Sequence, residues 1–451
     1  MDLGASLASV VGPAHVLVDP SVRASYEVDW TGRWTGSAVA VVRPSSTAEV
    51  AGVVSACAAA GVPVVPQGGN TGLVGGAVPY GAVVLSTRRL TSLSPVDGAG
   101  TCVAGAGCTL AALSAHAGAA GLEFGVDFAS RDSATVGGAV STNAGGLRVL
   151  RRGPMRASVV GVEAVLPSGA VLSRVEGPLK DSTGYDLSGL FCGAEGTLGV
   201  LTRVRVRLAA PLPSARTVVL AGLPSVSSAV SLAADVRASL PELSALEILS
   251  GEALELVGSP LPGRWPVAVL LETVGSVPDL PLPASADAVV GSDVADRARL
   301  WRCREEVASA ISAAGVPLKL DVSVPPSALA SLWSALPSVV ASVAPSARVI
   351  LFGHLAEANL HVNVLDVGAA ADAVSDAVLR LVASAGGSIS AEHGVGRAKV
   401  AYVPLTRSPA ELAAMRSVKA ALDPAGVMNP GVLLGPAESD GAATPRVPRI
   451  T

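Results

Sequence analysis

The chain has 451 residues, half of them hydrophobic, and a formal net charge of −4 at pH 7. This length predicts two or three domains, and a slightly acidic chain without a basic tract argues against binding to nucleic acid or a membrane surface. The five cysteines form no CxxC pair, so we expect reduced thiols in a cytoplasmic protein. Prolines interrupt the long uncharged run 322–347, which predicts a loop followed by a soluble helix.

The first unit opens with a β-α-β pattern. "SAVAVV" predicts a strand, and Ser46 or Thr47 is expected to cap a helix that runs to about Ala60 and stops at Gly61. "VPVVP" predicts the next strand, which enters the glycine-rich loop "PQGGNTGLVGGAVP", residues 66–79. Successive N–H groups in such a loop suit a pyrophosphate, although a tight turn without a ligand is the alternative.

Two further glycine-rich loops follow. Two strands and a helix are predicted across "GAVVLSTRRL", "GTCVAGAGCTL" and "LAALSAHAGAAGL", before the second loop, "SATVGGAVSTNAGG". "SVVGVEAVLPSGAVL" predicts a hairpin with its turn at 167–169. The third loop, "CGAEGTLGVLT", enters a strand that alternates Val with Arg and should have one wet face. Three such loops in order indicate one cofactor site more strongly than any single loop does.

Strand and helix patterns recur from Arg216 to about Val364 and predict a second domain. In it, "GHLAEANLHVNV" carries His354 and His361, two of the chain's five histidines. Their odd separation prevents a shared face on one ideal strand, so we expect a turn carrying His354, a strand starting near His361 and a bend that pairs them. From this stretch alone, metal ligation and two unrelated polar residues both remain open.

The C-terminal part closes the fold. We expect a helix, then a glycine-rich break that leads into "ISAEHGVGRAK", and a last helix that ends before "DPAGVMNPG". The tail "PAESDGAATPRVPRIT" is polar and proline-containing, so it is expected to be disordered.

Six motifs in this order resemble those of the vanillyl-alcohol oxidase superfamily, in its FAD-binding D-2-hydroxy-acid dehydrogenase branch. That branch includes D-lactate, glycolate and D-2-hydroxyglutarate dehydrogenases. The motifs cover about residues 36–435: "PQGGNTGLVGG", "ATVGGAVSTNAGG", "KDSTGYDLSGLFCGAEGTLGVLT", "GHLAEANLHVNV", "AEHGVGRAK" and "LDPAGVMNPG".

The resemblance implies an α+β fold. It comprises a two-subdomain FAD-binding domain of vanillyl-alcohol oxidase type and an α+β substrate (cap) domain with an antiparallel sheet. The expected divisions are an N-terminal segment 1–35, the FAD-binding domain 36–211, the substrate domain with a metal site 212–415, a C-terminal segment 416–435 that returns to the flavin, and the tail 436–451.

The resemblance also implies the FAD contacts. Asn70 stands in the loop where relatives with covalent FAD often carry histidine, so we expect FAD held without a covalent bond. The implied cofactor-binding residues are Pro66, Gly68, Gly69, Asn70, Thr71, Gly72, Leu73, Thr135, Gly138, Ser141, Thr142, Glu195, Gly196, Gly199, Val200 and Asn429.

A divalent metal, usually zinc in this branch, is implied at His354, His361 and Glu392. Two imidazoles and a carboxylate leave open positions for substrate, which is typical of a catalytic metal. The resemblance assigns His393 as a substrate contact and as the base that takes the hydroxyl proton while hydride passes to flavin N5. The alternative for His393 is a structural hydrogen bond.

Substrate anchors are implied at Arg304, Lys319 and Asn363, where Arg and Lys suit carboxylates. For Arg304 a surface salt bridge within the helix "REEV" is the alternative. Two departures from the branch concern substrate choice: Ala308 stands where the hydroxyglutarate enzymes have threonine, and "AEAN" replaces Gly-Asp-Gly-Asn. Lys319 favours a dicarboxylate, whereas Ala308 weakens that preference.

We therefore predict FAD- and metal-dependent oxidation of a D-2-hydroxy acid to the 2-oxo acid, with D-2-hydroxyglutarate slightly ahead of D-lactate or glycolate. A flavin-free metal-dependent hydrolase and a non-catalytic flavin or electron-transfer subunit are the alternatives of different class. The expected partners are the small hydroxy acid and an electron acceptor, which is a quinone, an electron-transfer flavoprotein or a cytochrome. No nucleic-acid partner is expected, and whether the protein forms a homodimer is left open.

Overall fold

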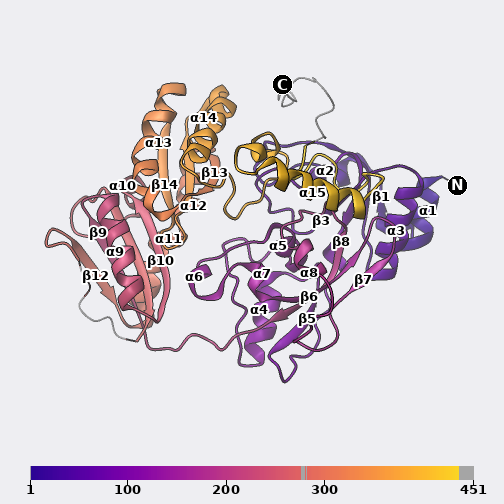
Figure 1. Ribbon diagram of the computed structural model, residues 1–451, viewed down its shortest axis with the longest axis horizontal. Coiled ribbons are helices and arrows are strands. Elements are labelled where there is room, and N and C mark those ends of the chain that lie inside the picture. The colour runs from indigo at the N-terminus through magenta and orange to yellow at the C-terminus, as the bar shows by residue number, and fades with distance from the viewer. Residues whose placement is uncertain (1, 276–279, 281, 436–451) are drawn as a thin grey trace. The chain divides into compact units, whose positions relative to one another are not determined.

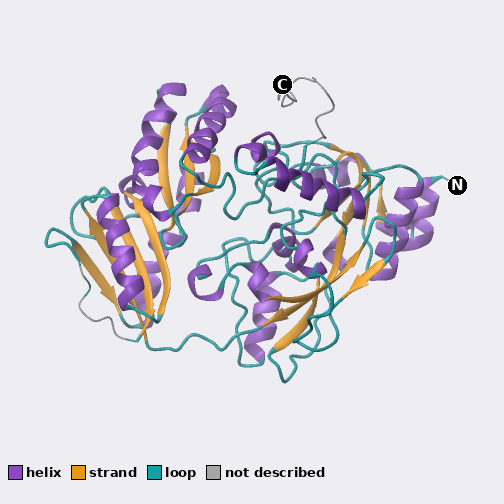
Figure 2. Cartoon of the chain, viewed as in Figure 1, coloured by secondary structure: helices purple, strands orange, loops and turns teal. Residues whose placement is uncertain are grey.

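The computed structural model describes residues 2–275, 280 and 282–435, and in this part the chain forms two compact units (Figure 1). Of the described residues, unit 1 contains 2–146, 152–211 and 392–435, and unit 2 contains 147–151 and the described part of 212–391. Both units combine helices with sheets (Figure 2), and the predicted α+β class is confirmed.

The unit boundaries differ from the expected divisions at three places. Residues 392–415 lie in unit 1, although we expected them in the substrate domain, because backbone N–H groups after Ala391 bond to unit 1; Arg397 N donates to Val74 O at 2.9 Å. Residues 1–35 also belong to unit 1, and the short stretch 147–151 packs with unit 2. The tail 436–451 lies outside the described residues.

The first sheet of unit 1 has the order β1-β2-β4-β3, with β1 antiparallel to β2 and the other pairs parallel. Its helix α3 (Thr47–Ala59) begins as predicted, because the Ser46 hydroxyl accepts a hydrogen bond from Glu49 N. The strands are β1 (Val16–Leu17), β2 (Ser37–Val42), β3 (Val64–Gln67) and β4 (Tyr80–Ser86).

The second sheet of unit 1 is antiparallel, with the order β5-β8-β6-β7. The predicted hairpin is confirmed: β6 and β7 pair around a turn in which Gly169 takes φ 83°. Along β8, Val204 and Val206 are buried and the arginines beside them are less so, which confirms the wet face. The strands are β5 (Thr101–Gly105), β6 (Val159–Val165), β7 (Val171–Ser173) and β8 (Val200–Arg207).

One hydrophobic core joins the two sheets of unit 1. Buried residues of α3, β4, β6 and β8 contact one another in it, together with those of two further helices, α4 and α5. The helices of this unit are α1 (Leu3–Val11), α2 (Pro20–Glu27), α4 (Leu110–Ala119), α5 (Val136–Thr142), α7 (Met155–Ser158), α8 (Leu187–Phe191) and α15 (Pro409–Leu422), with 3-10 turns η1 (Pro13–His15), η2 (Thr87–Arg89) and η5 (Val400–Leu405). The predicted end of α15 before "DPAG" is confirmed.

Unit 2 is built on one seven-stranded sheet with the order β12-β9-β11-β10-β14-β15-β13. All strand pairings in the described part of this sheet are antiparallel, which confirms the expected sheet. The strands are β9 (Arg216–Leu223), β10 (Leu243–Ser250), β11 (Val267–Val274), β12 (Asp287–Gly291), β13 (Leu318–Ser323), β14 (Arg348–His354) and β15 (Asn359–Leu365).

Helices cover both faces of this sheet (Figures 1 and 2). On one face, α10 (Gly251–Val257), α11 (Val294–Glu305) and α12 (Val307–Ala314) share a hydrophobic cluster with β9, β10, β11 and β14. From the other face, α9 (Val226–Ser239), α13 (Leu329–Val343) and α14 (Ala371–Ser384) contact the strands. Three short elements complete the order: α6 (Val149–Arg152), η3 (Pro326–Ala328) and η4 (Gly368–Ala370).

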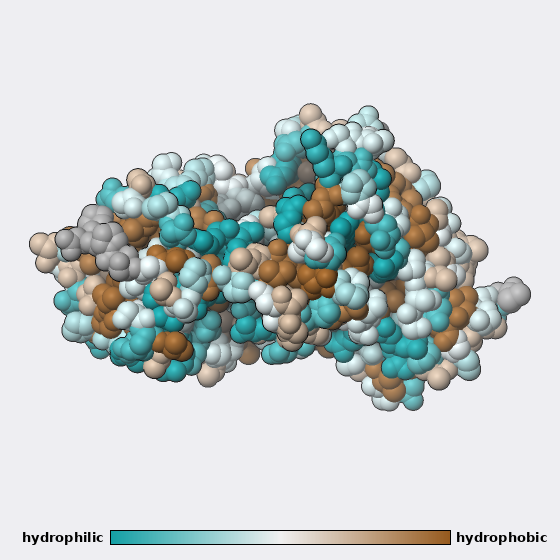
Figure 3. Space-filling model, turned by 90° about the horizontal axis from the view of Figure 1, so that it is seen from below, coloured by the Kyte–Doolittle hydropathy of each residue, from teal (hydrophilic) through white to brown (hydrophobic). Residues whose placement is uncertain are grey.

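One helical stretch in the described part, Pro326–Val343, is long and apolar enough to cross a membrane by length and composition. Five of its apolar residues are buried in unit 2: Leu329, Leu332, Trp333, Leu336 and Val340. On the face shown in Figure 3, brown hydrophobic residues form groups among teal and white ones. Scattered exposed apolar residues are normal for a folded domain.

Candidate active site

The two histidines of unit 2 lie on a β-hairpin. His354 is the last residue of β14, so our expectation that a turn carries it is wrong, whereas the strand near His361 is confirmed as β15. In the register, Phe352 pairs with His361 and His354 pairs with Asn359. Directly paired residues share a face, and so do residues two apart on one strand, so the hairpin places both imidazoles on one face. Their ring centroids are 5.4 Å apart, in an edge-on arrangement.

The same register gathers further polar side chains on this face. On β13, Asp321 pairs with His361, and Lys319 pairs with Asn363 of β15. On β10, Glu247 pairs with His354. We call this set the polar face of unit 2: Glu247, Lys319, Asp321, His354, His361 and Asn363.

Glu247 of the polar face contacts two other side chains. Its Oε1 lies 2.8 Å from His354 Nδ1, and its Oε2 accepts a hydrogen bond from Arg304 Nε at 2.6 Å. Burial alone would raise the pKa of this carboxyl, but the neighbouring His354 and Arg304 outweigh burial and hold the pKa below its usual value. Glu247 is therefore an ionised acceptor, and the imidazole proton stands on Nδ1 of His354.

Arg304 is buried, and its guanidinium also lies 4.7 Å from the centre of the Phe352 ring. The surface salt bridge within "REEV" that we weighed for it is wrong, because its partner Glu247 lies on a distant strand. Part of the guanidinium is thus committed to the protein, and its contact with substrate carboxylate stays a prediction.

Lys319, Asp321 and Asn363 line the β13–β15 side of the polar face. Burial lowers the pKa of the half-buried Lys319 ammonium. Asp321 is fully buried; its Oδ1 lies 3.3 Å from His361 Nδ1, and its Oδ2 accepts a hydrogen bond from Ala391 N at 3.0 Å. Asn363 is buried and donates to the carbonyl oxygen of His361. A cation and two amide or carboxylate groups therefore stand beside the imidazoles.

In unit 1, the first and second glycine-rich loops pack directly on each other. A Cβ at Gly69 would overlap the backbone oxygen of Ser133, and one at Gly68 would overlap the hydroxyl of Thr135, so only glycine fits at these two positions. Arg88 of η2 fixes the first loop by donating to the carbonyl oxygens of Gly68 and Gly69 at 3.2 and 3.0 Å. The loop is therefore held in shape before any ligand binds.

Asn70 sits in this loop with φ 56°, a left-handed conformation that asparagine tolerates. Its amide donates to Val28 O at 2.8 Å, so its side chain anchors the N-terminal segment. The second loop uses its hydroxyls similarly: Thr135 caps α5 by accepting from Gly138 N, and Thr142 donates to Gly138 O. The FAD contacts of these residues stay predictions.

The third loop is tied to the C-terminal part of the chain through Glu195. This carboxylate accepts hydrogen bonds from Val395 N and Gly396 N, both at 2.7 Å, and its burial raises its pKa. Asn429 donates from its amide to Glu195 O and to Gly76 O, which ties the third loop to the first. Val200 is fully buried in the core of unit 1, and its contact with the flavin stays a prediction.

Glu392 and His393 open the last stretch of unit 1. The Glu392 carboxylate rests against the second loop, because a Cβ at Gly145 would overlap it. The chain bends at residues 391–393, and Gly394 takes φ 82°, a left-handed conformation that suits glycine. Ala391, the last residue of unit 2, is bonded to Asp321, so one peptide link joins the polar face to Glu392.

Three residues of these sites escaped the sequence interpretation: Glu247, Asp321 and Arg88. Glu247 lies in "SALEILS", where a lone acid in an apolar strand was a usable signal, because a buried carboxylate needs a partner. Asp321 in "LKLDVSV" carries the same signal. The sequence around Arg88 contains no such signal, because the contacts of Arg88 depend on where η2 places it.

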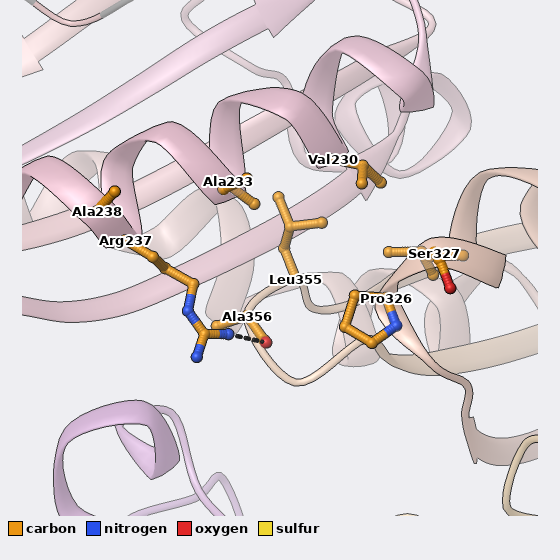
Figure 4. A pocket seen from close by; sticks show the side chains of 10 residues that line it. Val230, Ala233, Arg237, Ala238, Pro326, Ser327, Leu355 and Ala356 are labelled. Carbon is orange, nitrogen blue, oxygen red and sulfur yellow. Dashed lines mark hydrogen bonds between the residues drawn. The ribbon is translucent and has the colours of Figure 1, made fainter.

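A separate cavity of about 450 Å³ lies in unit 2 (Figure 4). It is formed by α9, by the start of α13 and by the turn after His354, where Arg237 donates to Ala356 O at 2.7 Å. Its other lining is mostly Ala, Val, Leu and Pro. The cavity is therefore apolar, unlike the polar face.

Comparisons with known proteins assign both halves of the chain. Residues 38–173 match the "FAD binding domain" family, and residues 212–433 match "FAD linked oxidases, C-terminal domain". The chain is 38% identical over 455 residues to D-2-hydroxyglutarate dehydrogenase, mitochondrial, of Bos taurus, covering 95% of this chain and 83% of the relative. It is also 38% identical to D-2-hydroxyglutarate dehydrogenase of Xanthomonas citri pv. viticola, covering 95% and 96%.

The solved structure of p-cresol methylhydroxylase with substrate bound has the same fold. Its TM-score is 0.77 at 16% identity, over 95% of each chain. At this identity the likeness concerns the fold alone.

Fold, loops and family matches together define an FAD-dependent oxidoreductase. The flavin-free hydrolase is thereby excluded, because residues 38–173 match an FAD-binding domain. More narrowly, the chain belongs to the D-2-hydroxy-acid dehydrogenase branch of the vanillyl-alcohol oxidase superfamily, as its relatives at 38% identity are D-2-hydroxyglutarate dehydrogenases.

Proposed function

We propose that this protein oxidises a D-2-hydroxy acid to the 2-oxo acid with FAD and a divalent cation, and that D-2-hydroxyglutarate is its substrate. The observation that carries this proposal is the polar face of unit 2, where two carboxylate-backed imidazoles stand on the same face as a half-buried lysine. The relatives named D-2-hydroxyglutarate dehydrogenase support the choice of substrate.

The donor set fits a divalent cation. His354 Nδ1 is hydrogen-bonded to the buried Glu247, and His361 Nδ1 lies 3.3 Å from the buried Asp321. A carboxylate beside one ring nitrogen is the usual environment of a histidine that binds a metal through its other nitrogen. Glu392 would be the third ligand, and the set then resembles catalytic rather than structural zinc sites. When bound, the cation supplies Lewis acidity that favours the ionised form of a neighbouring hydroxyl group.

In this mechanism the chain's own groups bind substrate and move the proton. Lys319 binds a carboxylate, Asn363 adds a polar contact, and His393 takes the hydroxyl proton at an imidazole nitrogen. When bound, FAD supplies the ring that accepts hydride from C2 of the substrate. The glycine-lined loops hold the dinucleotide through backbone N–H groups, with Arg88 keeping the first loop in shape.

FAD is held without a covalent bond in this proposal. Asparagine offers no nucleophile at position 70, and its amide is already bonded to Val28 O. Acid precipitation tests this directly: the yellow colour should stay in the supernatant, and colour that remains with the precipitated polypeptide would contradict it.

The decisive experiment is anaerobic flavin reduction by a panel of D- and L-2-hydroxy acids, with metal-free and zinc-, manganese- or cobalt-reloaded protein. We expect fast bleaching by D-2-hydroxyglutarate, slow bleaching by L-acids, and no turnover after chelation although FAD stays bound. D-Lactate is the second candidate, because Ala308 offers no hydroxyl for a distal carboxylate. Full activity of metal-free protein would refute the cation.

The electron acceptor stays a prediction, as a quinone, an electron-transfer flavoprotein or a cytochrome. The same holds for the cytoplasmic location. Some relatives carry the word mitochondrial in their names, which describes those proteins.

A further inference from the structure

Each histidine of the polar face is backed by its own buried carboxylate, and the two carboxylates come from different strands. Glu247 of β10 lies 2.8 Å from His354 Nδ1, and Asp321 of β13 lies 3.3 Å from His361 Nδ1. Glu247 is 1% exposed and Asp321 0%. A buried carboxylate is costly unless it is well paired, so two of them behind two adjacent imidazoles require an explanation beyond core packing.

In each carboxylate, the oxygen that does not face the imidazole accepts a second hydrogen bond. Arg304 Nε donates to Glu247 Oε2, and Ala391 N donates to Asp321 Oδ2. Each carboxylate therefore has one oxygen held by a donor that must have an acceptor. The other oxygen of Glu247 is hydrogen-bonded to His354 Nδ1, and the other oxygen of Asp321 lies at an ion-pair distance of 3.3 Å from His361 Nδ1. Because an ionised carboxylate can only accept, both contacts favour a proton on Nδ1, most directly at His354.

We infer that Glu247 and Asp321 are positioning residues that select the Nδ1–H tautomer of His354 and His361, and so preset both rings to bind a divalent cation through Nε2. The inference rests on the proposed metal site. Asp321 also accepts a hydrogen bond from Ala391 N, and Ala391 directly precedes Glu392, the proposed third ligand. Asp321 thus aligns His361 and the start of the Glu392 segment through one carboxylate.

Amide variants test this inference sharply because the far donors dictate how each amide must turn. In Glu247→Gln, Arg304 Nε still needs an acceptor, so the amide oxygen faces Arg304 and the NH₂ group faces His354. In Asp321→Asn, the Ala391 N–H likewise needs an acceptor. The amide oxygen therefore faces Ala391, and the NH₂ group faces His361. Each imidazole must then accept at Nδ1 and carry its proton on Nε2, which is the wrong tautomer for the metal.

The first measurement is cation affinity, made on FAD-loaded, metal-stripped protein by zinc competition with a chromophoric chelator. Loss of an outer carboxylate typically weakens metal binding about 10- to 100-fold, and we expect that loss in each variant with FAD content unchanged. The matched control is Glu272→Gln. Glu272 is another 1% exposed carboxylate of this sheet, bonded to Arg148 and Trp301, and its amide variant should destabilise the fold without weakening zinc binding.

The second measurement needs no metal. The chain has only five histidines, so ¹⁵N imidazole shifts of the metal-free wild type at pH 8 can report each tautomer. We expect Nδ1–H for His354 and His361, and Nε2–H for the affected ring in each variant. This wild-type readout decides the inference even if one variant fails to fold.

The outcomes separate the inference from the proposed function. If the metal-free wild-type protein binds no divalent ion, the proposed metal site is refuted. The ¹⁵N shifts of His354 and His361 still test whether Glu247 and Asp321 select their tautomers. Wild type that binds zinc, with both variants binding equally well, overturns the inference and leaves the metal site standing. An Nε2–H tautomer for either ring in the wild type overturns it as well.

Discussion

The two candidate sites in this molecule are built from different parts of the chain. In unit 1, the cofactor loops are shaped by backbone: glycines 68 and 69 fit because a Cβ would overlap the second loop, and Asn429 bonds to two carbonyl oxygens. In unit 2, the polar face is made of side chains that strand register brings together from four strands. A backbone-built site is specified by local composition, whereas a register-built site depends on distant pairings.

The two kinds of site should therefore respond differently to substitution. In unit 1, adding a single methyl group is damaging, because a loop that must approach a ligand closely has no room to shift. In unit 2, small changes of shape are better tolerated than changes of charge, since the ionised groups of the polar face stabilise one another. The predictions below test this contrast, from the largest expected effect to the smallest.

His393→Ala should have the largest effect. Losing a general base typically costs about 100- to 10,000-fold in rate, while substrate binding should change little because the carboxylate anchors lie on other residues. Stopped-flow flavin reduction measures the rate, and its dependence on substrate concentration gives the binding constant. His116→Ala is the control, since His116 in unit 1 bonds to Ser94 O away from the loops. A His393 variant that reduces flavin at near wild-type rate at every pH would reassign the base.

Lys319→Ala should distinguish the two substrate candidates. For a dicarboxylate it removes a charge-assisted contact of roughly 1.5 to 3 kcal/mol, or about 10- to 150-fold in kcat/KM. For D-lactate the loss should be small, because no distal carboxylate is present. Ala308→Thr should help the dicarboxylate selectively by adding a hydroxyl donor. Equal losses for both acids, with no gain from threonine, would show that these positions do not bind the distal end, and the exposed Lys180→Ala serves as control.

Gly69→Ala should weaken FAD binding without touching a side-chain contact. Overpacking costs about 1 to 3 kcal/mol, so the affinity for FAD should fall on the order of 5- to 150-fold. Fluorescence titration of the apoprotein with FAD measures it. Gly118→Ala is the matched control: Gly118 lies on α4 with open space around it, and alanine there should leave FAD binding intact and favour the helix. Undiminished affinity in Gly69→Ala would mean that the loop can shift.

This contrast also explains how much the sequence could predict. The strands, the cap of α3, the end of α15 and the hairpin at 167–169 follow from local patterns and could be predicted, whereas the FAD contacts of Gly68 and Gly69 stay predictions. Motif position identified Arg304 but not its partner, because Glu247 lies 57 residues away along the chain. Pairing across β10, β14, β15 and β13 decides which polar residues meet, and local periodicity does not encode register between distant strands.

The smallest expected effect is a pH dependence of substrate binding that comes from Lys319. Burial lowers the pKa of this ammonium, so its charge is lost at a lower pH than for an exposed lysine. Only the charged form attracts a carboxylate, and binding should therefore be strongest below the lowered pKa and weaken as pH rises through it. We expect KM for D-2-hydroxyglutarate to rise as the pH is raised towards and through the lowered pKa of Lys319, with D-lactate as the flat internal control. Lys319→Arg should remove this slope, because a guanidinium stays charged throughout the range. A slope that persists in the arginine variant would place the titrating group elsewhere and weaken the assignment of Lys319 to the distal carboxylate.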